Sequence, residues 1–247
     1  MSSPDAAPTL VLVCFAVPEE AAPFRAIALP AAHGPVEILV TGMGSKNARS
    51  AFLNRLQPSQ PTQPTQPTPG LVLTCGFAGG LDPALARGTV VHDADPNAHA
   101  DTGLELASHL LQSGSRPVRF HCAPRVATSR LEKRALREST HADAVEMESG
   151  IIRELCRERG IPAATVRVIS DAANDDLPLD FNALMSADMK LDFRKLAAHL
   201  LLHPRAIPGL IRLRRHTADA ARRLADVLAR LVLRQPGTNP GTEPPRR

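Results

Sequence analysis

Continuous apolar runs alternate along the chain with segments whose apolar residues recur at helical spacing. A continuous apolar run is typical of a strand buried on both faces, as in parallel sheets. The predicted strands are residues 9–17, 36–41, 71–75, 89–93 and 163–169. The predicted helices are residues 46–56, 144–159 and 195–234. Strands that alternate with helices in this way predict an α/β domain around a mainly parallel sheet.

One predicted helix, residues 144–159, carries a carboxylate on its apolar stripe. Glu148, Ile151 and Leu155 recur at the spacing of one helix face, and Gly160 follows as a C-cap. A buried carboxylate is costly unless a partner hydrogen-bonds it. Glu148 is therefore predicted to contact either a bound ligand or a buried arginine.

Proline-rich segments interrupt and follow this pattern. Residues 57–70 read QPSQPTQPTQPTPG, and proline lacks the N–H donor that a helix or a sheet requires. The repeat favours a solvated polyproline loop within one domain that spans residues 8–234, and a ligand for a proline-recognition domain is the alternative. Residues 235–247 are predicted to form a disordered tail by the same logic.

Composition limits the partners and the location. The net charge is +4, and the chain has no dense basic stripe with interleaved aromatic residues, so the sequence argues against nucleic-acid binding. Residues 195–234 are basic and amphipathic, a pattern that usually packs on a sheet but can also lie on an anionic membrane. Four cysteines without C-x-x-C spacing, no signal-peptide pattern and no run of membrane-spanning length predict a cytoplasmic protein.

Acidic residues and glycines follow three of the predicted strands. Glu19 and Glu20 come after the first strand, GFAGG (76–80) after the third, and Ser170 and Asp171 after the strand at 163–169. Ligands of α/β proteins bind at the carboxyl edge of the sheet, where glycines allow close approach and carboxylates can transfer protons. Neither GMGS (42–45) nor GFAGG fits a dinucleotide or P-loop fingerprint.

A group of metal-ligating residue types occurs in HDADPNAHAD (92–101), which contains His92, Asp95, His99 and Asp101. Their spacing matches no ligand motif, so no metal is predicted.

Five segments together resemble a known family. They are VCFAVPEEAAPFR, VTGMGSKNA, VLTCGFAGGLDPALARGTVV, AVEMES and IPAATVRVISDAAND, and they cover most of residues 10–176. Their order and spacing resemble the purine nucleoside phosphorylase/uridine phosphorylase superfamily, and most of all its methylthioadenosine/S-adenosylhomocysteine nucleosidases. The resemblance implies a three-layer fold with a mixed, mainly parallel sheet, no cofactor, and a homo-oligomer.

The resemblance assigns the reacting groups. Asp171 would be the general acid that protonates N7 of the purine, and Ser170 would orient its side chain. Glu20 would activate the attacking water, and Arg167 would support the water site. The bottom-up alternatives are a helix N-cap for Asp171 and a solvated first-turn residue for Glu20.

The resemblance also assigns the substrate contacts. Glu148 would bind the ribose hydroxyls, and Met147 would pack against the nucleoside. The loop that contains Phe77, Ala78 and Gly79 would lie beside the substrate, with Phe77 in place of the family's small polar residue near the nucleophile.

The predicted function is hydrolysis of the N-glycosidic bond of a purine nucleoside, such as methylthioadenosine or S-adenosylhomocysteine. Consecutive carboxylates at Glu19 and Glu20 would repel a phosphate dianion, which favours water as the nucleophile. A phosphate-dependent phosphorylase is one alternative, and HPRAIPGLIRLRR (203–215) resembles the hopanoid-associated members, which act on an adenosyl lipid. A non-catalytic nucleoside-binding protein, with Phe77 closing the nucleophile site, is the other.

Overall fold

The computed structural model describes residues 9–30, 34–57, 67–94, 100–186 and 188–233, with the side chains of 100–102 left out. Most of the predicted polyproline loop, the predicted tail, and Asp95 and His99 of the histidine-rich segment lie outside the described residues.

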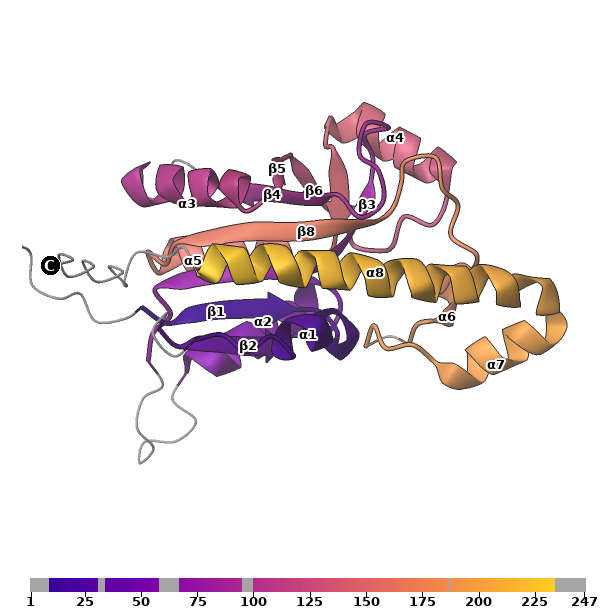
Figure 1. The fold of residues 1–247 in the computed structure, drawn as a ribbon. Coiled ribbons are helices and arrows are strands. Elements are labelled where there is room, and N and C mark those ends of the chain that lie inside the picture. Colours follow the sequence, from indigo (N-terminus) through magenta and orange to yellow (C-terminus); the bar gives the residue numbers. More distant parts are fainter. Residues whose placement is uncertain (1–8, 31–33, 58–66, 95–99, 187, 234–247) are drawn as a thin grey trace, which may run out of the picture.

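Within these ranges eight strands form one mixed sheet, which confirms the predicted fold class (Figure 1). The strands are β1 Val11–Phe15, β2 Val36–Val40, β3 Leu71–Gly80, β4 Val90–Ala94, β5 Arg116–Pro117, β6 Phe120–Cys122, β7 Ala144–Glu146 and β8 Ala163–Asp171. The main path runs β2-β1-β3-β8-β4-β5, and β7 joins β3 to β6 beside it. Five strand pairs are parallel, whereas β4–β8 and β3–β7 are antiparallel.

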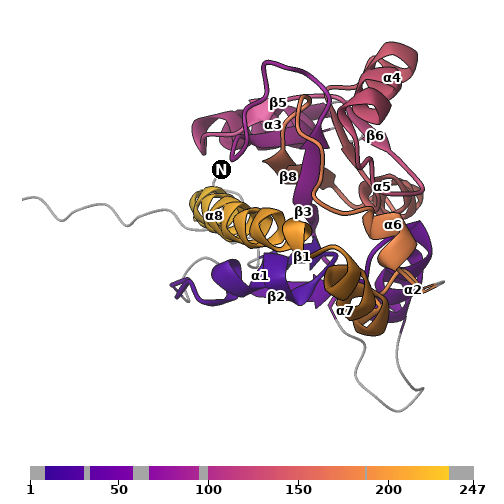
Figure 2. The ribbon, with the colours of Figure 1, turned by 90° about the vertical axis from the view of Figure 1, so that its right-hand side faces the viewer.

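Helices cover both faces of this sheet, so the molecule has three layers (Figure 2). They are α1 Pro18–Arg25, α2 Ser45–Leu56, α3 Ala100–Gln112, α4 Arg130–Thr140, α5 Ser149–Glu158, α6 Phe181–Leu184, α7 Phe193–Leu202 and α8 Ile207–Val232. One face of β1, β3 and β8 packs on α1, α3 and α8, and the other packs on α2 and α5. The apolar strands are buried on both sides for this reason.

The predicted helix at 144–159 is wrong in its first turn. Residues Ala144–Glu146 form β7, which pairs with the end of β3, and α5 begins only at Ser149. The Glu146 side chain accepts the backbone N–H groups of Glu148 at 2.9 Å and Ser149 at 2.7 Å, so it satisfies donors at the start of α5. Glu148 lies one residue before α5. Its spacing to Ile151 and Leu155 therefore does not place it on the apolar face of a helix.

Two predicted strands are longer than the sequence pattern indicated. The strand at 71–75 continues through GFAGG to Gly80, and the strand at 163–169 continues to Asp171. The two are paired from Val72 onward, with a register shift between Ala78 and Gly79. The glycine-rich segment is therefore part of the sheet and not a loop beyond it.

The C-terminal helical region divides into a packed part and a projecting part. The second half of α8 is buried against α1, β3 and β8. In contrast, α7 and the first half of α8 extend past the end of the sheet as a helical hairpin, residues 193–216 (Figure 1). Large apolar side chains are exposed on this hairpin: Phe193, Leu201, Leu202, Ile207 and Ile211. No helix in the described ranges is long and apolar enough to cross a membrane.

We expect Leu228→Ala to lower the free energy of unfolding by about 2–5 kcal/mol, because Leu228 is fully buried between α8 and the sheet. The matched control is Leu201→Ala on α7, where the side chain is 83% exposed and the loss should stay below about 0.5 kcal/mol. Urea denaturation measures both values. Equal losses for the two variants would contradict the packing described for α8.

Candidate active site

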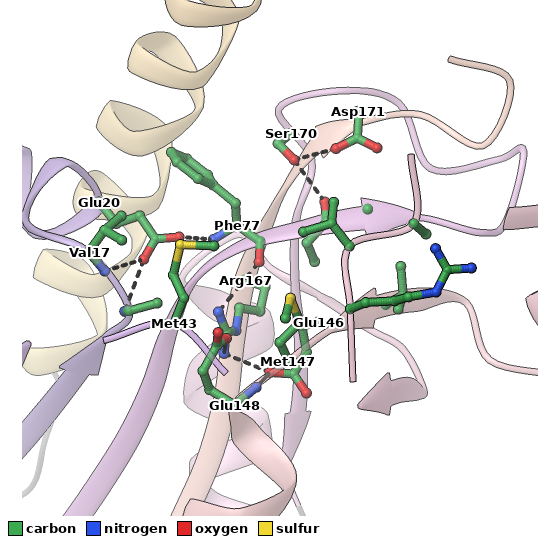
Figure 3. Close-up of a pocket in the computed structure, with 17 residues that line it drawn as sticks. Val17, Glu20, Met43, Phe77, Glu146, Met147, Glu148, Arg167, Ser170 and Asp171 are labelled. Atoms are coloured by element: carbon green, nitrogen blue, oxygen red, sulfur yellow. Dashed lines mark hydrogen bonds and ion pairs between the residues drawn. The ribbon is translucent and has the colours of Figure 1, made fainter. Parts of the chain in front are cut away.

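A cavity of 210 Å³ opens where β1, β3 and β8 end at their carboxyl edge (Figure 3). All nine residues predicted from the sequence line it. They are Glu20, Phe77, Ala78, Gly79, Met147, Glu148, Arg167, Ser170 and Asp171. The structure thus brings together residues from four separate segments of the chain, while the roles given to them stay predictions.

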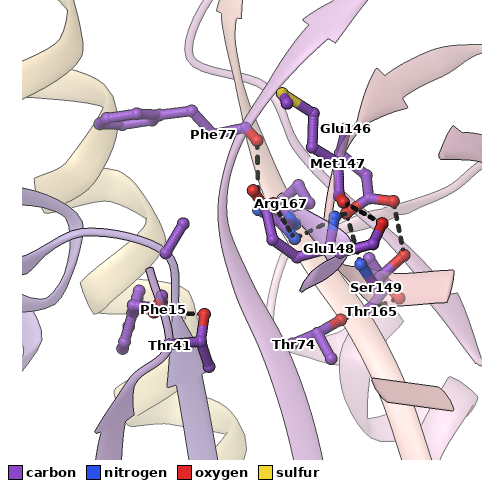
Figure 4. Close-up of polar contacts among 12 residues, drawn as sticks. Phe15, Thr41, Thr74, Phe77, Glu146, Met147, Glu148, Ser149, Thr165 and Arg167 are labelled. Atoms are coloured by element: carbon purple, nitrogen blue, oxygen red, sulfur yellow. Dashed lines mark hydrogen bonds and ion pairs between the residues drawn. The ribbon is translucent and has the colours of Figure 1, made fainter. Parts of the chain in front are cut away.

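The centre of the cavity floor is Arg167, whose side chain is only 2% exposed (Figure 4). Its Nη2 donates to Glu146 Oε2 at 2.7 Å and to Glu148 Oε2 at 3.1 Å. Burial opposes its charged form, but Glu146, Glu148 and Glu20 together raise the pKa of Arg167 above its usual value. Its Nε is buried and has no hydrogen-bond partner among the described residues.

The two carboxylates that pair with Arg167 differ in their surroundings. Burial alone would raise the pKa of Glu146, but Arg167 and the donors of Ser149 and Glu148 bring it below the usual value. For Glu148, burial dominates and raises the pKa, against the opposing effect of Arg167 and the Gly44 N–H at 2.9 Å. Glu146 is therefore the permanent counter-ion of Arg167. Glu148 contacts a buried arginine, as one of its two predicted alternatives required, and also faces the cavity.

The third carboxylate, Glu20, comes from the first turn of α1, which Pro18 begins. Its Oε2 accepts the N–H groups of Ala16 at 3.0 Å and Val17 at 3.3 Å, and its Oε1 accepts the N–H of Phe77 at 2.8 Å. Burial raises its pKa to about 7, and Arg167 and these hydrogen bonds limit the rise. Glu20 is buried, so the alternative of a solvated first-turn glutamate is wrong.

Close approach of Glu20 and Arg167 depends on Gly76. This residue has φ +139°, and a Cβ placed on it would lie 2.6 Å from Glu20 Oε1 and 2.8 Å from Arg167 Nη1. Phe77 follows in the strand, and its ring packs on the apolar cluster beneath α8 and points away from Arg167 (Figure 4). Phe77 lines the same cavity as Glu20, and the non-catalytic alternative, in which Phe77 closes the nucleophile site, stays a prediction.

Asp171 ends β8 on the other side of the cavity (Figure 3). Its Oδ1 lies 2.5 Å from the Ser170 hydroxyl, which is also 3.3 Å from the Ala78 carbonyl oxygen. Its Oδ2 forms an ion pair with Lys133 of α4, a lysine with no exposed side-chain area. Asp171 does not cap a helix, because the next helix, α6, is capped by Asp180.

Among the residues that sequence reasoning missed, three shape the polar contacts of this site: Glu146, Gly76 and Lys133. Glu146 could have been found by treating AVE as a strand, since alternation places Ala144 and Glu146 on one side of it. Gly76 belongs to the GFAGG segment, but its role beside Glu20 and Arg167 was not predicted. Nothing in the local sequence distinguishes Lys133 from its neighbours in RLEKRALRES.

The histidine-rich segment is separate from the cavity. His92 is buried, and its Nδ1 lies 2.8 Å from the Ser115 hydroxyl. Burial lowers its pKa to about 4, so it is neutral at physiological pH. No group of three or more metal-ligating side chains occurs among the residues that the structure describes.

Comparison with known proteins shows a likeness to one superfamily over part of the chain. Residues 113–201 match the model of the phosphorylase superfamily. A 5'-methylthioadenosine/S-adenosylhomocysteine nucleosidase of Shewanella sp. (strain W3-18-1) is 28% identical over 151 residues, which cover 47% of this chain and 62% of the nucleosidase. Over these residues the chain is similar to the phosphorylase superfamily. The matched region spans less than two thirds of the length of this relative.

Solved structures of similar fold include two nucleoside hydrolases. The S-adenosylhomocysteine nucleosidase of Streptococcus pyogenes, in complex with 5-methylthiotubericidin, superimposes with a TM-score of 0.66 at 13% identity and covers 94% of this chain and 99% of its own. The futalosine hydrolase of Helicobacter pylori gives a TM-score of 0.62 at 15% identity and covers 91% and 97%. At these identities the likeness establishes the fold.

We expect Gly76→Ala to destabilise the protein by about 2 kcal/mol or more beyond the cost of backbone strain, because its Cβ would displace Glu20 and Arg167. The matched control is Gly160→Ala, where φ is +64° and no atom lies within 4 Å of the added Cβ, so only strain is introduced. Urea denaturation separates the two effects. Equal destabilisation by both variants would show that the space at Gly76 is not needed.

Proposed function

We propose that this protein hydrolyses the N-glycosidic bond of a purine nucleoside. The observation that carries the proposal is the set of three buried carboxylates around the one buried guanidinium of Arg167 at the cavity floor. This arrangement can hold and deprotonate a water molecule, and the nucleosidases that the chain resembles support the reaction class.

Glu20 is the proposed base. Its two oxygens are fixed by backbone donors, and a pKa of about 7 leaves a large fraction ionised at neutral pH. A general base is most effective when its pKa is near the working pH.

The charge at the cavity floor favours water over phosphate. Arg167 already pairs with Glu146 and Glu148, and the other arginine lining the cavity, Arg125, pairs with Glu132 at 2.5 Å and is 61% exposed. Among the described lining residues no cation is left to neutralise a phosphate dianion. The three carboxylates at the cavity floor outnumber the Arg167 guanidinium and would repel the dianion.

Asp171 and Glu148 are the proposed contacts to the two halves of the nucleoside. Asp171 gives a proton to N7 as the bond between C1′ and N9 breaks, so the electron pair moves onto a neutral base. Glu148 accepts hydrogen bonds from the ribose hydroxyls, with Met147 packing beside the sugar. An adenosine derivative such as methylthioadenosine or S-adenosylhomocysteine is the proposed substrate, on the strength of the named relatives. The cytoplasmic location and the homo-oligomer stay predictions.

We expect base release to depend on the ionised form of Glu20. Because the base must be deprotonated, kcat/KM should fall about tenfold per unit as the pH drops below about 7. Glu20→Gln should lower turnover by about 10²–10⁴-fold, whereas Glu19→Gln, at the exposed neighbouring residue, should leave it unchanged. Release of adenine from methylthioadenosine, followed by ultraviolet absorbance, measures both. A wild-type rate of adenine release in Glu20→Gln would show that Glu20 is not the base.

The second candidate is an enzyme that takes its nucleoside from a membrane. The hairpin at 193–216 favours it, because its exposed apolar residues are accompanied by six Lys and Arg and no Asp or Glu. Exposed apolar and basic residues together suit the surface of an anionic bilayer.

Flotation with phosphatidylglycerol-containing vesicles tests this candidate. If it is correct, the protein floats at 0.1 M salt and a Phe193→Ser/Leu201→Ser variant does not. Leu131→Ser, on an equally exposed leucine of α4, is the control and should float like the wild type. A wild-type protein that stays with the soluble fraction would contradict it.

A further inference from the structure

Lys133 is a buried cation that lies outside the cavity lining. It comes from the first turns of α4, and its side chain has no exposed area. Besides its ion pair with Asp171, its Nζ donates to the carbonyl oxygens of Ala172 at 2.9 Å and Asp175 at 3.0 Å. An ammonium has three N–H donors, so two of them are used by these carbonyl oxygens, and its charge is met by the ion pair with Asp171.

A lysine is a costly choice for this position. Removing an ammonium from water is unfavourable unless a carboxylate and good hydrogen bonds compensate. If Lys133 only fastened the turn after β8, an uncharged donor would serve the two carbonyl oxygens at lower cost. The group here that calls for a cation is Asp171 in its ionised form.

The surroundings of Asp171 are arranged to admit this cation. Its Oδ2 is buried and accepts no hydrogen bond of ordinary geometry among the described residues, so the ammonium is what meets its charge. Both partners lie beside Gly79 of β3: a Cβ there would be 3.4 Å from Asp171 Oδ2 and 3.8 Å from Lys133 Cε, which are ordinary contact distances. The other oxygen, Oδ1, is fixed by Ser170.

We propose that Lys133 is a positioning residue for the proton transfer to the leaving base. Its ammonium fixes the Asp171 carboxyl group and stabilises the negative charge that Asp171 acquires when its proton passes to N7. The proton leaves Asp171, the electron pair of the C1′–N9 bond moves onto the base, and the carboxylate that remains is paired with Lys133. A charge placed in advance where charge develops lowers the barrier without reorganisation. This inference rests on the proposed function.

A double-mutant cycle with Lys133→Met and Asp171→Asn tests the proposal. We expect Lys133→Met to lower kcat for methylthioadenosine about 10²-fold, with KM and the Kd for free adenine within about threefold of the wild type. Asp171→Asn alone should lower kcat by about 10²–10⁴-fold. Because Lys133 acts through Asp171, the double variant should be no slower than Asp171→Asn.

Two controls separate this role from a structural one. Asp175→Asn weakens the same turn, since Asp175 pairs with Arg87 and accepts the Ala172 N–H, but leaves the ammonium on Asp171. Arg134→Met makes the matching change at the exposed next residue of α4. Both should keep kcat within about threefold of the wild type.

Distinct results would overturn the proposal. Wild-type kcat in Lys133→Met, or a double variant at least tenfold slower than Asp171→Asn, would contradict it while the proposed function stands. If Lys133→Met does not fold, the double variant, which removes both charges of the buried pair, still gives the comparison with Asp171→Asn. No base release by the wild-type protein would overturn the proposed function, and this inference with it.

Discussion

The guanidinium of Arg167 lies where β3, β7 and β8 meet, and it is the group that allows three carboxylates to share one buried space. Glu146 and Glu148 contact it directly, and Glu20 lies across Gly76 from it. Removing one partner of such a buried pair typically costs about 3–5 kcal/mol, because the other charge is left without compensation. The arrangement is therefore both a structural requirement and the source of the site's electrostatics: Glu146 stays ionised, while Glu20 has a pKa near neutrality.

Each end of the cavity places a buried cation beside carboxyl groups, but the ratio of the two differs. At the Arg167 end, carboxylates outnumber the cation, which suits a water molecule that must lose a proton. At the Asp171 end, a single carboxyl group faces a single buried ammonium, which suits a group that gives up a proton. Gly76 of β3 leaves the room for the contacts of Glu20 and Arg167, and Gly79 of the same strand lies beside Asp171 and Lys133. The glycine-rich end of β3 thus connects the two ends of the site.

Much of this arrangement follows from local sequence patterns, and the rest depends on tertiary contacts. Buried strands were predictable from continuous apolar runs, and Glu20, Phe77 and Asp171 as candidates from the motifs that follow them. The roles of the site residues, and the choice of Met147 and Glu148, came from the family resemblance. The pattern failed at AVEMES, because Glu148, Ile151 and Leu155 have helical spacing although Ala144–Glu146 pairs with β3. It also failed at GFAGG, where glycines suggest a loop but pairing with β8 extends the strand. The contact of Lys133 could not be predicted from the sequence, because only the tertiary fold places α4 against the end of β8.

The claim that the cavity floor selects water is tested most directly by identifying the sugar product when phosphate is present. Methylthioadenosine would be incubated with the protein over a range of inorganic phosphate concentrations, and the products would be observed by ³¹P nuclear magnetic resonance alongside the rate of adenine release. The account predicts a rate that does not rise with phosphate and a free sugar with no sugar 1-phosphate signal. A rate that rises and saturates with phosphate, together with a sugar 1-phosphate signal, would contradict it.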